Sequence, residues 1–110
     1  MLSADLKRGT LELLLLSLLE GRHRHGYEIG KLLEERSGGQ VQFRVSTLYS
    51  ILYRMEHRGW IKGRWIEKQD ERRRCRYSLT PAGRAVMVTQ RQEWRAFSDM
   101  VNEVAGVSHA

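Results

Sequence analysis

The stretch Ser46-Thr-Leu-Tyr-Ser-Ile-Leu-Tyr-Arg-Met-Glu-His-Arg58, closed by Gly59, has the periodicity of an amphipathic helix. Its apolar residues fall at i, i+3, i+4 and i+7, which places one side of the helix against a core. These core residues are Leu48, Ile51, Leu52 and Met55. The opposite side is polar and aromatic: Ser46, Ser50, Tyr53, Arg54 and His57, flanked by Thr47 and Tyr49. Small hydroxyl residues let a helix N-terminus approach phosphate, although the same pattern also suits an ordinary solvated helix.

Two strand-like segments follow this helix around a basic turn. Residues 60–67 and 73–79 have the length and composition of strands, and the polar tip 68–72 joins them. We expect the hairpin core to consist of Ile61, Trp65, Tyr77 and Leu79, and the basic cluster to consist of Arg72, Arg73, Arg74 and Arg76. A run of charge is often only a solvated surface, and Asp70 with Glu71 offsets part of it. A helix followed by a basic hairpin is nevertheless the order found in winged-helix DNA readers.

Two further helices are expected before this unit. The first should run from Gly9 or Thr10 to Glu20, and its leucines cover nearly the whole circumference, so it should pack on two sides. The second should cover residues 26–36 and end at Ser37-Gly38-Gly39, because glycine suits a left-handed cap. Residues 21–25 should form a solvated loop. Residues 40–45 alternate weakly and should form a short strand or an extended lead-in.

A long last helix should begin with Thr80 as N-cap and Pro81 in the first turn, and run to about Val104. An apolar stripe on it would be difficult to cover in a chain of this length: Met87, Trp94, Phe97, Val101 and Ala105. Exposed apolar stripes imply partners, and a two-fold homodimer is the default solution. We expect dimer or effector contacts at Leu11, Leu15, Met87, Trp94, Phe97 and Val101. The fold class is therefore mainly α with a small β-hairpin: a winged helix-turn-helix over residues 1–80, then a C-terminal dimerisation helix and tail over 81–110.

Charge and cysteine content agree with this interpretation. The 110 residues carry 19 Lys and Arg against 13 Asp and Glu, a net charge of +6, which favours a polyanionic partner but does not distinguish DNA from RNA or an anionic membrane. The single cysteine, Cys75, excludes an internal disulfide and suits a reducing cytoplasm. The leucine-rich run 11–19 is interrupted by Glu12 and is too short to span a bilayer, so we expect no membrane partner.

Catalytic and metal-binding classes find little support in the residues. No nucleophile with a base, no phosphate-binding glycine loop and no paired acids stand out, so an enzyme is not expected. A metal sensor could use His23, His25, His57 or Cys75, whose side chains suit zinc or copper. Their spacing is not that of a usual site, and the His-x-His loop should be solvated. We expect neither a metal nor a cofactor.

Five short motifs, taken in order, resemble the PadR family of bacterial transcription regulators. They are Gly9-Thr-Leu-Glu-Leu13, His25-Gly-Tyr-Glu-Ile29, Thr47-Leu-Tyr49, Arg54-Met-Glu56 with Gly59, and Tyr77-x-Leu-Thr-Pro-Ala-Gly83. The resemblance covers residues 7–104 and implies a homodimer that represses at a palindromic promoter operator until an effector binds. The length is similar to the short form with one C-terminal helix. The family usually has an acidic or small residue and then glycine where Val45-Ser46 stands, proline at Ser50, and often tyrosine at Arg76, so base contacts should differ here.

The resemblance and the residue pattern together predict the functional residues. Expected contacts to double-stranded DNA are Tyr27, Lys31, Arg44, Ser46, Thr47, Tyr49, Ser50, Tyr53, Arg54, Arg72, Arg73, Arg74 and Arg76. In the family, a tryptophan at the position of Trp94 can stack flat aromatic compounds between subunits, which implies a planar aromatic effector. The simpler interpretation is a tryptophan that only packs the dimer interface, because the sequence does not show which residues would line a pocket. The alternatives to a DNA-binding repressor are a metal-responsive regulator and a non-specific nucleic-acid-binding protein.

Overall fold

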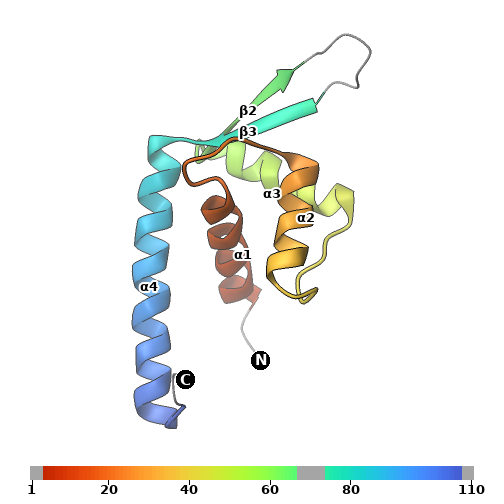
Figure 1. Cartoon of the computed structure of the whole chain (residues 1–110). Helices are drawn as coiled ribbons and strands as arrows, with labels where there is room; N and C mark the ends of the chain where they lie inside the picture. Colours follow the sequence, from red (N-terminus) through yellow and green to blue (C-terminus); the bar gives the residue numbers. More distant parts are fainter. Residues whose placement is uncertain (1–3, 67–73, 108–110) are drawn as a thin grey trace.

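The structure is a computed structural model that describes residues 4–66 and 74–107, with side chains described for residues 9–66 and 75–107. Within this part, the chain forms four helices and a small antiparallel sheet. In chain order the elements are α1 (Ala4–Leu18), β1 (Arg24–His25), α2 (Gly26–Arg36), α3 (Val45–His57), β2 (Ile61–Ile66), β3 (Arg74–Leu79) and α4 (Pro81–Ala105). Figure 1 shows α1, α2 and α3 gathered beneath the sheet, with α4 running down one side. The predicted fold class, a winged helix-turn-helix followed by a long helix, is confirmed.

The helix-turn-helix unit depends on a close approach of α2 and α3. An added Cβ at Gly26 would lie 2.6 Å from the Tyr49 hydroxyl, and one at Gly30 would lie 2.8 Å from a methyl group of Leu48. The predicted bounds of α2 are confirmed, and Gly38 and Gly39 have φ of 64° and 82° after it. Residues 40–44 form no strand, and the chain enters α3 at Val45 in an extended conformation. The predicted apolar side of α3 is buried: Leu48, Ile51, Leu52 and Met55.

The sheet has three strands in the order β1-β3-β2, and not only the two strands of the predicted hairpin. The supposed solvated loop supplies β1, where Arg24 pairs with Tyr77 and His25 with Arg76. The Arg24 side chain is buried: its Nε–H donates to the Leu18 carbonyl (2.6 Å) and it forms an ion pair with Glu28 (3.2 Å). A two-residue strand is too short to produce a periodic pattern, so the sequence gives no sign of it.

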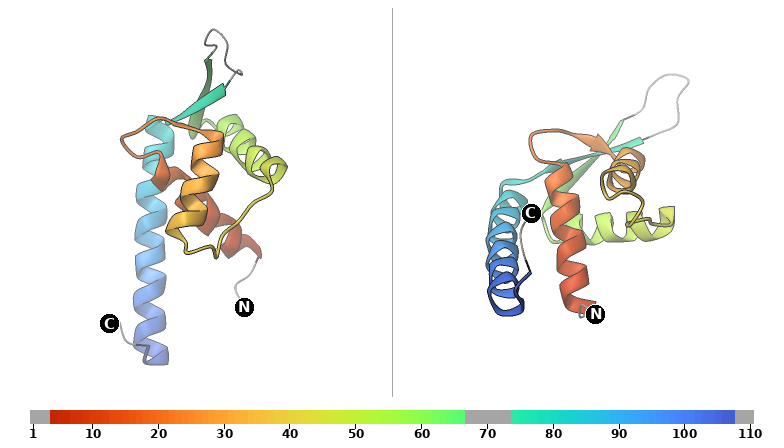
Figure 2. Two further views of the ribbon diagram at one scale, coloured as in Figure 1. Left: turned by 45° about the vertical axis from the view of Figure 1, so that its right-hand side comes forward. Right: turned by 60° about the horizontal axis from the view of Figure 1, so that its bottom comes forward.

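The hairpin leaves the core before its tip. Ile61 and Tyr77 are buried as predicted, and Leu79 packs against them. Trp65, predicted to be core, is 56% exposed. Figure 2 shows the strands continuing beyond the helices, so an inward-facing side chain near the tip lacks a helix to cover it. The predicted tip, residues 68–72, lies outside the described residues.

Helix α1 differs from its predicted bounds at both ends. It begins at Ala4 instead of Gly9 or Thr10, because a glycine is tolerated inside a helix that packing stabilises. It ends at Leu18 instead of Glu20, where tighter turns and Gly21 at φ 71° redirect the chain. The leucines pack on two sides as expected, against α2 and against α4. No helix in the described residues is long and apolar enough to cross a membrane.

Helix α4 begins with the predicted cap. Thr80 Oγ1 accepts a hydrogen bond from the Gly83 N–H (2.9 Å) and donates to the Gly59 carbonyl (2.6 Å), which joins the helix start to the end of α3. Two predicted interface residues, Leu15 and Met87, are fully buried inside the chain. They lie where α1 and α4 meet the core, so a second copy could not reach them. The exposed apolar residues of α4 lie mainly further along it, at Val88, Trp94, Met100 and Val104.

Gly83 provides a test of this junction. An added Cβ there would overlap the Trp60 backbone carbonyl, which has no flexible side chain to move aside. Gly83→Ala should therefore lower the free energy of unfolding by about 3 kcal/mol or more. The matched control is Gly9→Ala, where a Cβ meets nothing within 4 Å and should add about 0.5–1 kcal/mol of helix stability. Urea denaturation of both variants at one protein concentration would measure this, and equal stabilities would contradict the packing described.

Candidate nucleic-acid interface

The side of α3 opposite the core is open to solvent along its whole length. Its exposed residues are Ser46, Thr47, Tyr49, Ser50, Tyr53, Arg54 and His57. Tyr53, in the middle of this face, is 71% exposed. The N-cap residue Arg44 makes no side-chain hydrogen bond to the first turn of α3. The first amide groups of α3 therefore have no side-chain cap from Arg44 and lie beside the exposed hydroxyl residues Ser46 and Thr47, an arrangement suited to an anion.

Helix α2 contributes the neighbouring edge of this face. Tyr27 is 73% exposed, and Lys31 and Arg44 are also exposed. A hollow of about 300 Å³ lies on the surface where α2 meets the start of α3, and its lining includes Tyr27, Lys31 and Tyr49. Because the Tyr49 ring lies against Gly26, this residue also holds the two helices together. The structure thus brings three of the predicted residues, Tyr27, Lys31 and Tyr49, together around one hollow.

The hairpin has a cationic side that faces away from the core. Alternation along β2 turns Lys62 and Arg64 outward, and the register places Arg64 opposite Arg76 and Lys62 opposite Ser78. A broad hollow of about 910 Å³ lies over this side, lined by His23, Lys62, Gly63, Arg64, Trp65, Ile66, Arg76 and Ser78. Lys62 and Arg64 were not among the predicted contacts, although their period-two spacing in the sequence could have identified them. Arg72 and Arg73 lie outside the described residues, as does the side chain of Arg74.

The end of α3 is anchored to its surroundings by polar contacts. The Glu56 carboxylate accepts a hydrogen bond from the Gly63 N–H of β2 (2.9 Å). Arg58 forms an ion pair with the buried Glu12 of α1 (3.4 Å), and its guanidinium lies 5.1 Å from the centre of the Trp60 ring. Burial raises the pKa of the Tyr77 phenol, beside Cys75, well above its usual range, so the group stays neutral beneath the sheet.

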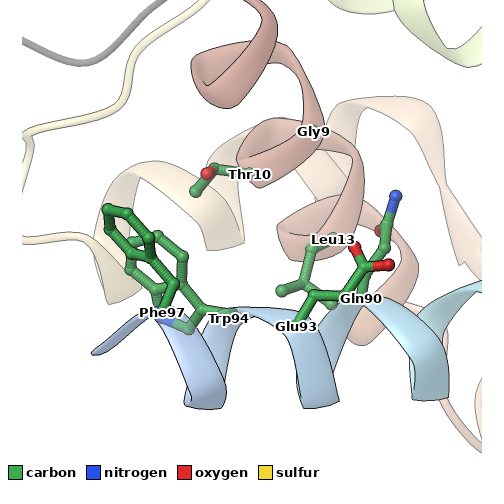
Figure 3. Close-up of a pocket in the computed structure, with 7 residues that line it drawn as sticks. All are labelled: Gly9, Thr10, Leu13, Gln90, Glu93, Trp94 and Phe97. Carbon is green, nitrogen blue, oxygen red and sulfur yellow. The ribbon is translucent and has the colours of Figure 1, made fainter. Parts of the chain in front are cut away.

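A second feature lies away from this surface, between α1 and α4. Figure 3 shows a pocket lined by Gly9, Thr10 and Leu13 of α1 and by Gln90, Glu93, Trp94 and Phe97 of α4. Its volume is about 340 Å³. The Trp94 and Phe97 rings are stacked, with centroids 5.7 Å apart and planes 26° apart. Gln90 Oε1 is buried and accepts no hydrogen bond within the described residues.

An exposed ion pair also joins the same two helices. Arg91 of α4 donates to both carboxylate oxygens of Glu20 (3.0 and 3.2 Å) and to the Ser17 hydroxyl (3.3 Å). The Arg91 hydrogen bonds hold the pKa of Glu20 below its usual value. This contact links the C-terminal end of α1 to α4.

The candidate metal ligands are not gathered into a site. His57 is exposed at the end of α3, Cys75 is buried in the sheet, and His23 lies beside the hairpin. Within residues 4–66 and 74–107, no group of three or more His, Cys, Asp or Glu side chains is placed to hold a metal ion.

The chain resembles one known protein family and several solved structures. Residues 15–89 match the transcriptional regulator PadR-like family. A transcriptional regulator from Clostridium thermocellum is 32% identical, with a TM-score of 0.80 and coverage of 94% of this chain and 98% of that one. A PadR family transcription regulator from Clostridium difficile R20291 is 31% identical, with a TM-score of 0.73 and coverage of 84% and 95%.

A third solved structure is Bacillus subtilis PadR in complex with operator DNA. It is 24% identical, with a TM-score of 0.65 and coverage of 72% of this chain and 45% of that one, a likeness that shows a shared fold. The family match extends from the buried leucines of α1 to the first turns of α4. Because it spans more than half of the sequence, the chain belongs to the PadR-like family of transcriptional regulators.

Proposed function

We propose that this protein is a sequence-specific, double-stranded-DNA-binding repressor that acts in the cytoplasm as a homodimer. The observation that supports this most strongly is the open polar face of α3, a helix that packs against a hairpin carrying cations on its outer side. An α-helix fits the major groove of B-form DNA, and a basic hairpin can reach the flanking backbone. The shared fold with a PadR solved on operator DNA supports the same assignment.

Reading and positioning would fall to different residues. Hydroxyl groups of Ser46, Thr47, Ser50 and Tyr53 would contact base edges, with modest specificity because a hydroxyl bonds to most bases. Cations would contact phosphates and fix the register without reading sequence. We assign this positioning role to Lys31, Arg44, Arg54, Lys62, Arg64 and Arg76, together with Arg72, Arg73 and Arg74. Tyr27 and Tyr49 complete the surface where α2 meets α3.

The C-terminal half of α4 would form the dimer interface. Phe97, Met100, Val101 and Val104 follow the i, i+3, i+4, i+7 spacing of one helix stripe, and Met100 and Val104 are well exposed. In this proposal residues 81–110 dimerise and residues 1–80 bind DNA. A two-fold axis would then present two α3 helices to successive major grooves about 34 Å apart, which matches a palindromic operator.

The effector site would be the pocket between α1 and α4. A planar aromatic compound could stack on Trp94 and Phe97, and an N–H or O–H group on it could satisfy Gln90 Oε1. A ligand wedged there would alter the tilt of α4 against α1. Since α4 would join the subunits, a small change in tilt would alter the separation of the two α3 helices and release the operator.

The first consequence of this proposal is a strong salt dependence. If the two subunits neutralise six to eight phosphates, the logarithm of the DNA association constant should fall against the logarithm of salt concentration with a slope of roughly −5 to −7. Fluorescence anisotropy with a duplex from the gene's own upstream region would measure it at several salt concentrations. A slope near zero would overturn the proposed DNA contacts.

A second test separates positioning from reading. Arg73→Ala should weaken binding to operator and random DNA alike and reduce the steepness of the salt slope by roughly 2 in a dimer. Ser50→Ala and Tyr53→Ala should instead lower the operator-to-random affinity ratio, by about tenfold. Arg95→Ala, which removes an exposed cation from the middle of α4, is the matched control and should change neither. If the α3 variants lose affinity equally for both DNAs, α3 is not the reading element.

A third test concerns Trp94, which is 41% exposed on α4. Trp94→Ala should leave the winged-helix fold intact, weaken dimerisation at least about tenfold, and abolish quenching of indole fluorescence by planar aromatic compounds. Analytical ultracentrifugation and fluorescence titration would measure these effects. The control Val88→Ala removes an exposed apolar side chain elsewhere on α4, at 45% exposure, and should preserve both. A Trp94→Ala protein that remains dimeric and still responds, through Trp60 or Trp65, would move the interface and the pocket elsewhere.

A further inference from the structure

We propose that Glu56 is a positioning residue for DNA recognition, which ties the hairpin to α3 so that both reach the duplex as one rigid unit. The inference rests on the proposed DNA-binding function and adds to it. Glu56 lies on the last turn of α3, and its Oε2 accepts a hydrogen bond from the backbone N–H of Gly63 in β2 (2.9 Å). A side chain of the reading helix thereby holds the backbone of the hairpin directly.

The chain makes room for this contact. An added Cβ at Gly63 would lie 2.9 Å from Glu56 Oε2, 2.8 Å from Cys75 Sγ and 3.1 Å from the Tyr77 ring. Each of these distances is too short for any residue larger than glycine unless a neighbour shifts. Glycine at position 63 therefore permits the carboxylate to reach the strand, and the buried Cys75 and Tyr77 support the strand from the paired side.

The position of the hydrogen bond along β2 matters for the hairpin. Ile61, two residues before Gly63, is buried in the core, whereas Trp65, two residues after it, is more than half exposed. The Glu56 contact thus lies where core packing declines and the ribbon projects outward. An isolated two-stranded hairpin is at best marginally stable in water. An attachment at this point fixes the direction of the outer cations Arg64 and Arg76 relative to α3.

The choice of an acid at this site is informative. Glu56 is the one acidic residue in the thirteen residues of α3, and a carboxylate close to DNA phosphates is repelled by them. The negative charge of Glu56 by itself would therefore weaken binding to DNA. Glu56 instead supplies a hydrogen-bond acceptor for the Gly63 N–H, and this contact sets the geometry between α3 and the hairpin.

The test compares two substitutions of Glu56 on a duplex selected from a random-sequence library by the wild-type protein. Glu56→Ala removes the acceptor, whereas Glu56→Gln keeps a carbonyl oxygen while removing the charge. We expect Glu56→Ala to bind about tenfold more weakly and to lose roughly 2 from the steepness of the salt slope, because the hairpin contacts of both subunits loosen. Glu56→Gln should restore most of the affinity and the slope. Glu35→Ala, which removes an exposed acid from α2, controls for the change in net charge.

A double-mutant cycle adds a readout that loss of stability would not move. Arg64→Ala should weaken binding in the wild-type background and have a smaller effect when combined with Glu56→Ala, because the loosened hairpin no longer presents Arg64 in register. The positioning role would be overturned if the affinity losses from Glu56→Ala and Arg64→Ala were additive. It would also be overturned if Glu56→Ala and Glu56→Gln bound DNA equally and more tightly than the wild-type protein. If Glu56→Ala fails to fold, the double variant Glu56→Gln with Gly63→Ala takes its place and is compared with Glu56→Gln alone. The salt slope of the double variant should be less steep. Absence of duplex binding by the wild-type protein would instead refute the DNA-binding function itself.

Discussion

The close approach of α3 to its neighbours is the constraint on which the rest of this structure depends. Glycines at 26 and 30 let α2 lie against Tyr49 and Leu48, and glycine at 63 lets β2 lie against Glu56. With these contacts made, the apolar side of α3 is fully used in the core, and its polar side has no alternative to solvent. Small residues at three points thus decide which face of one helix is open to a partner.

Local sequence signals were enough for the elements that carry their own periodicity or caps. The bounds of α2, the buried side of α3 and the Thr80 cap could be predicted because spacing and capping residues act within a few positions. Contacts distant in sequence were not visible. Strand β1 exists only because Arg24 and His25 meet β3, and the exposure of Trp65 depends on where α3 ends beneath the hairpin. The burial of Leu15 and Met87 likewise follows from how α1 and α4 cross.

The residues of the candidate interface also divide into those that local sequence signals predict and those that depend on contacts distant in sequence. The exposed residues of α3 follow from its hydrophobic face, so they could be predicted from the sequence. The outward cations Lys62 and Arg64 were not predicted, because the strand-like composition of residues 60–67 does not by itself say which side of the hairpin each residue faces. The Glu56 to Gly63 hydrogen bond joins different elements, and a glutamate near the end of an amphipathic helix gives no local sign of its partner. Geometry between elements is therefore what the three-dimensional structure adds.

The packing of α1 limits how any signal could pass from α4 to the proposed DNA-binding surface. Leu15, Leu16 and Leu19 are almost completely buried, so α1 is locked into the core with α2 and α3. Close-packed interiors deform little and shift as units. Glu12 further ties α1 to the end of α3 through Arg58. In the proposed regulation, a change at the α1 and α4 contact would therefore move the winged-helix unit, together with the buried start of α4, against the second half of α4, while the face of α3 kept its shape. In a dimer joined through α4, regulation would then act on the spacing between two intact winged-helix units. Binding to an operator with altered half-site spacing would therefore respond to the effector differently from binding to an operator with altered bases.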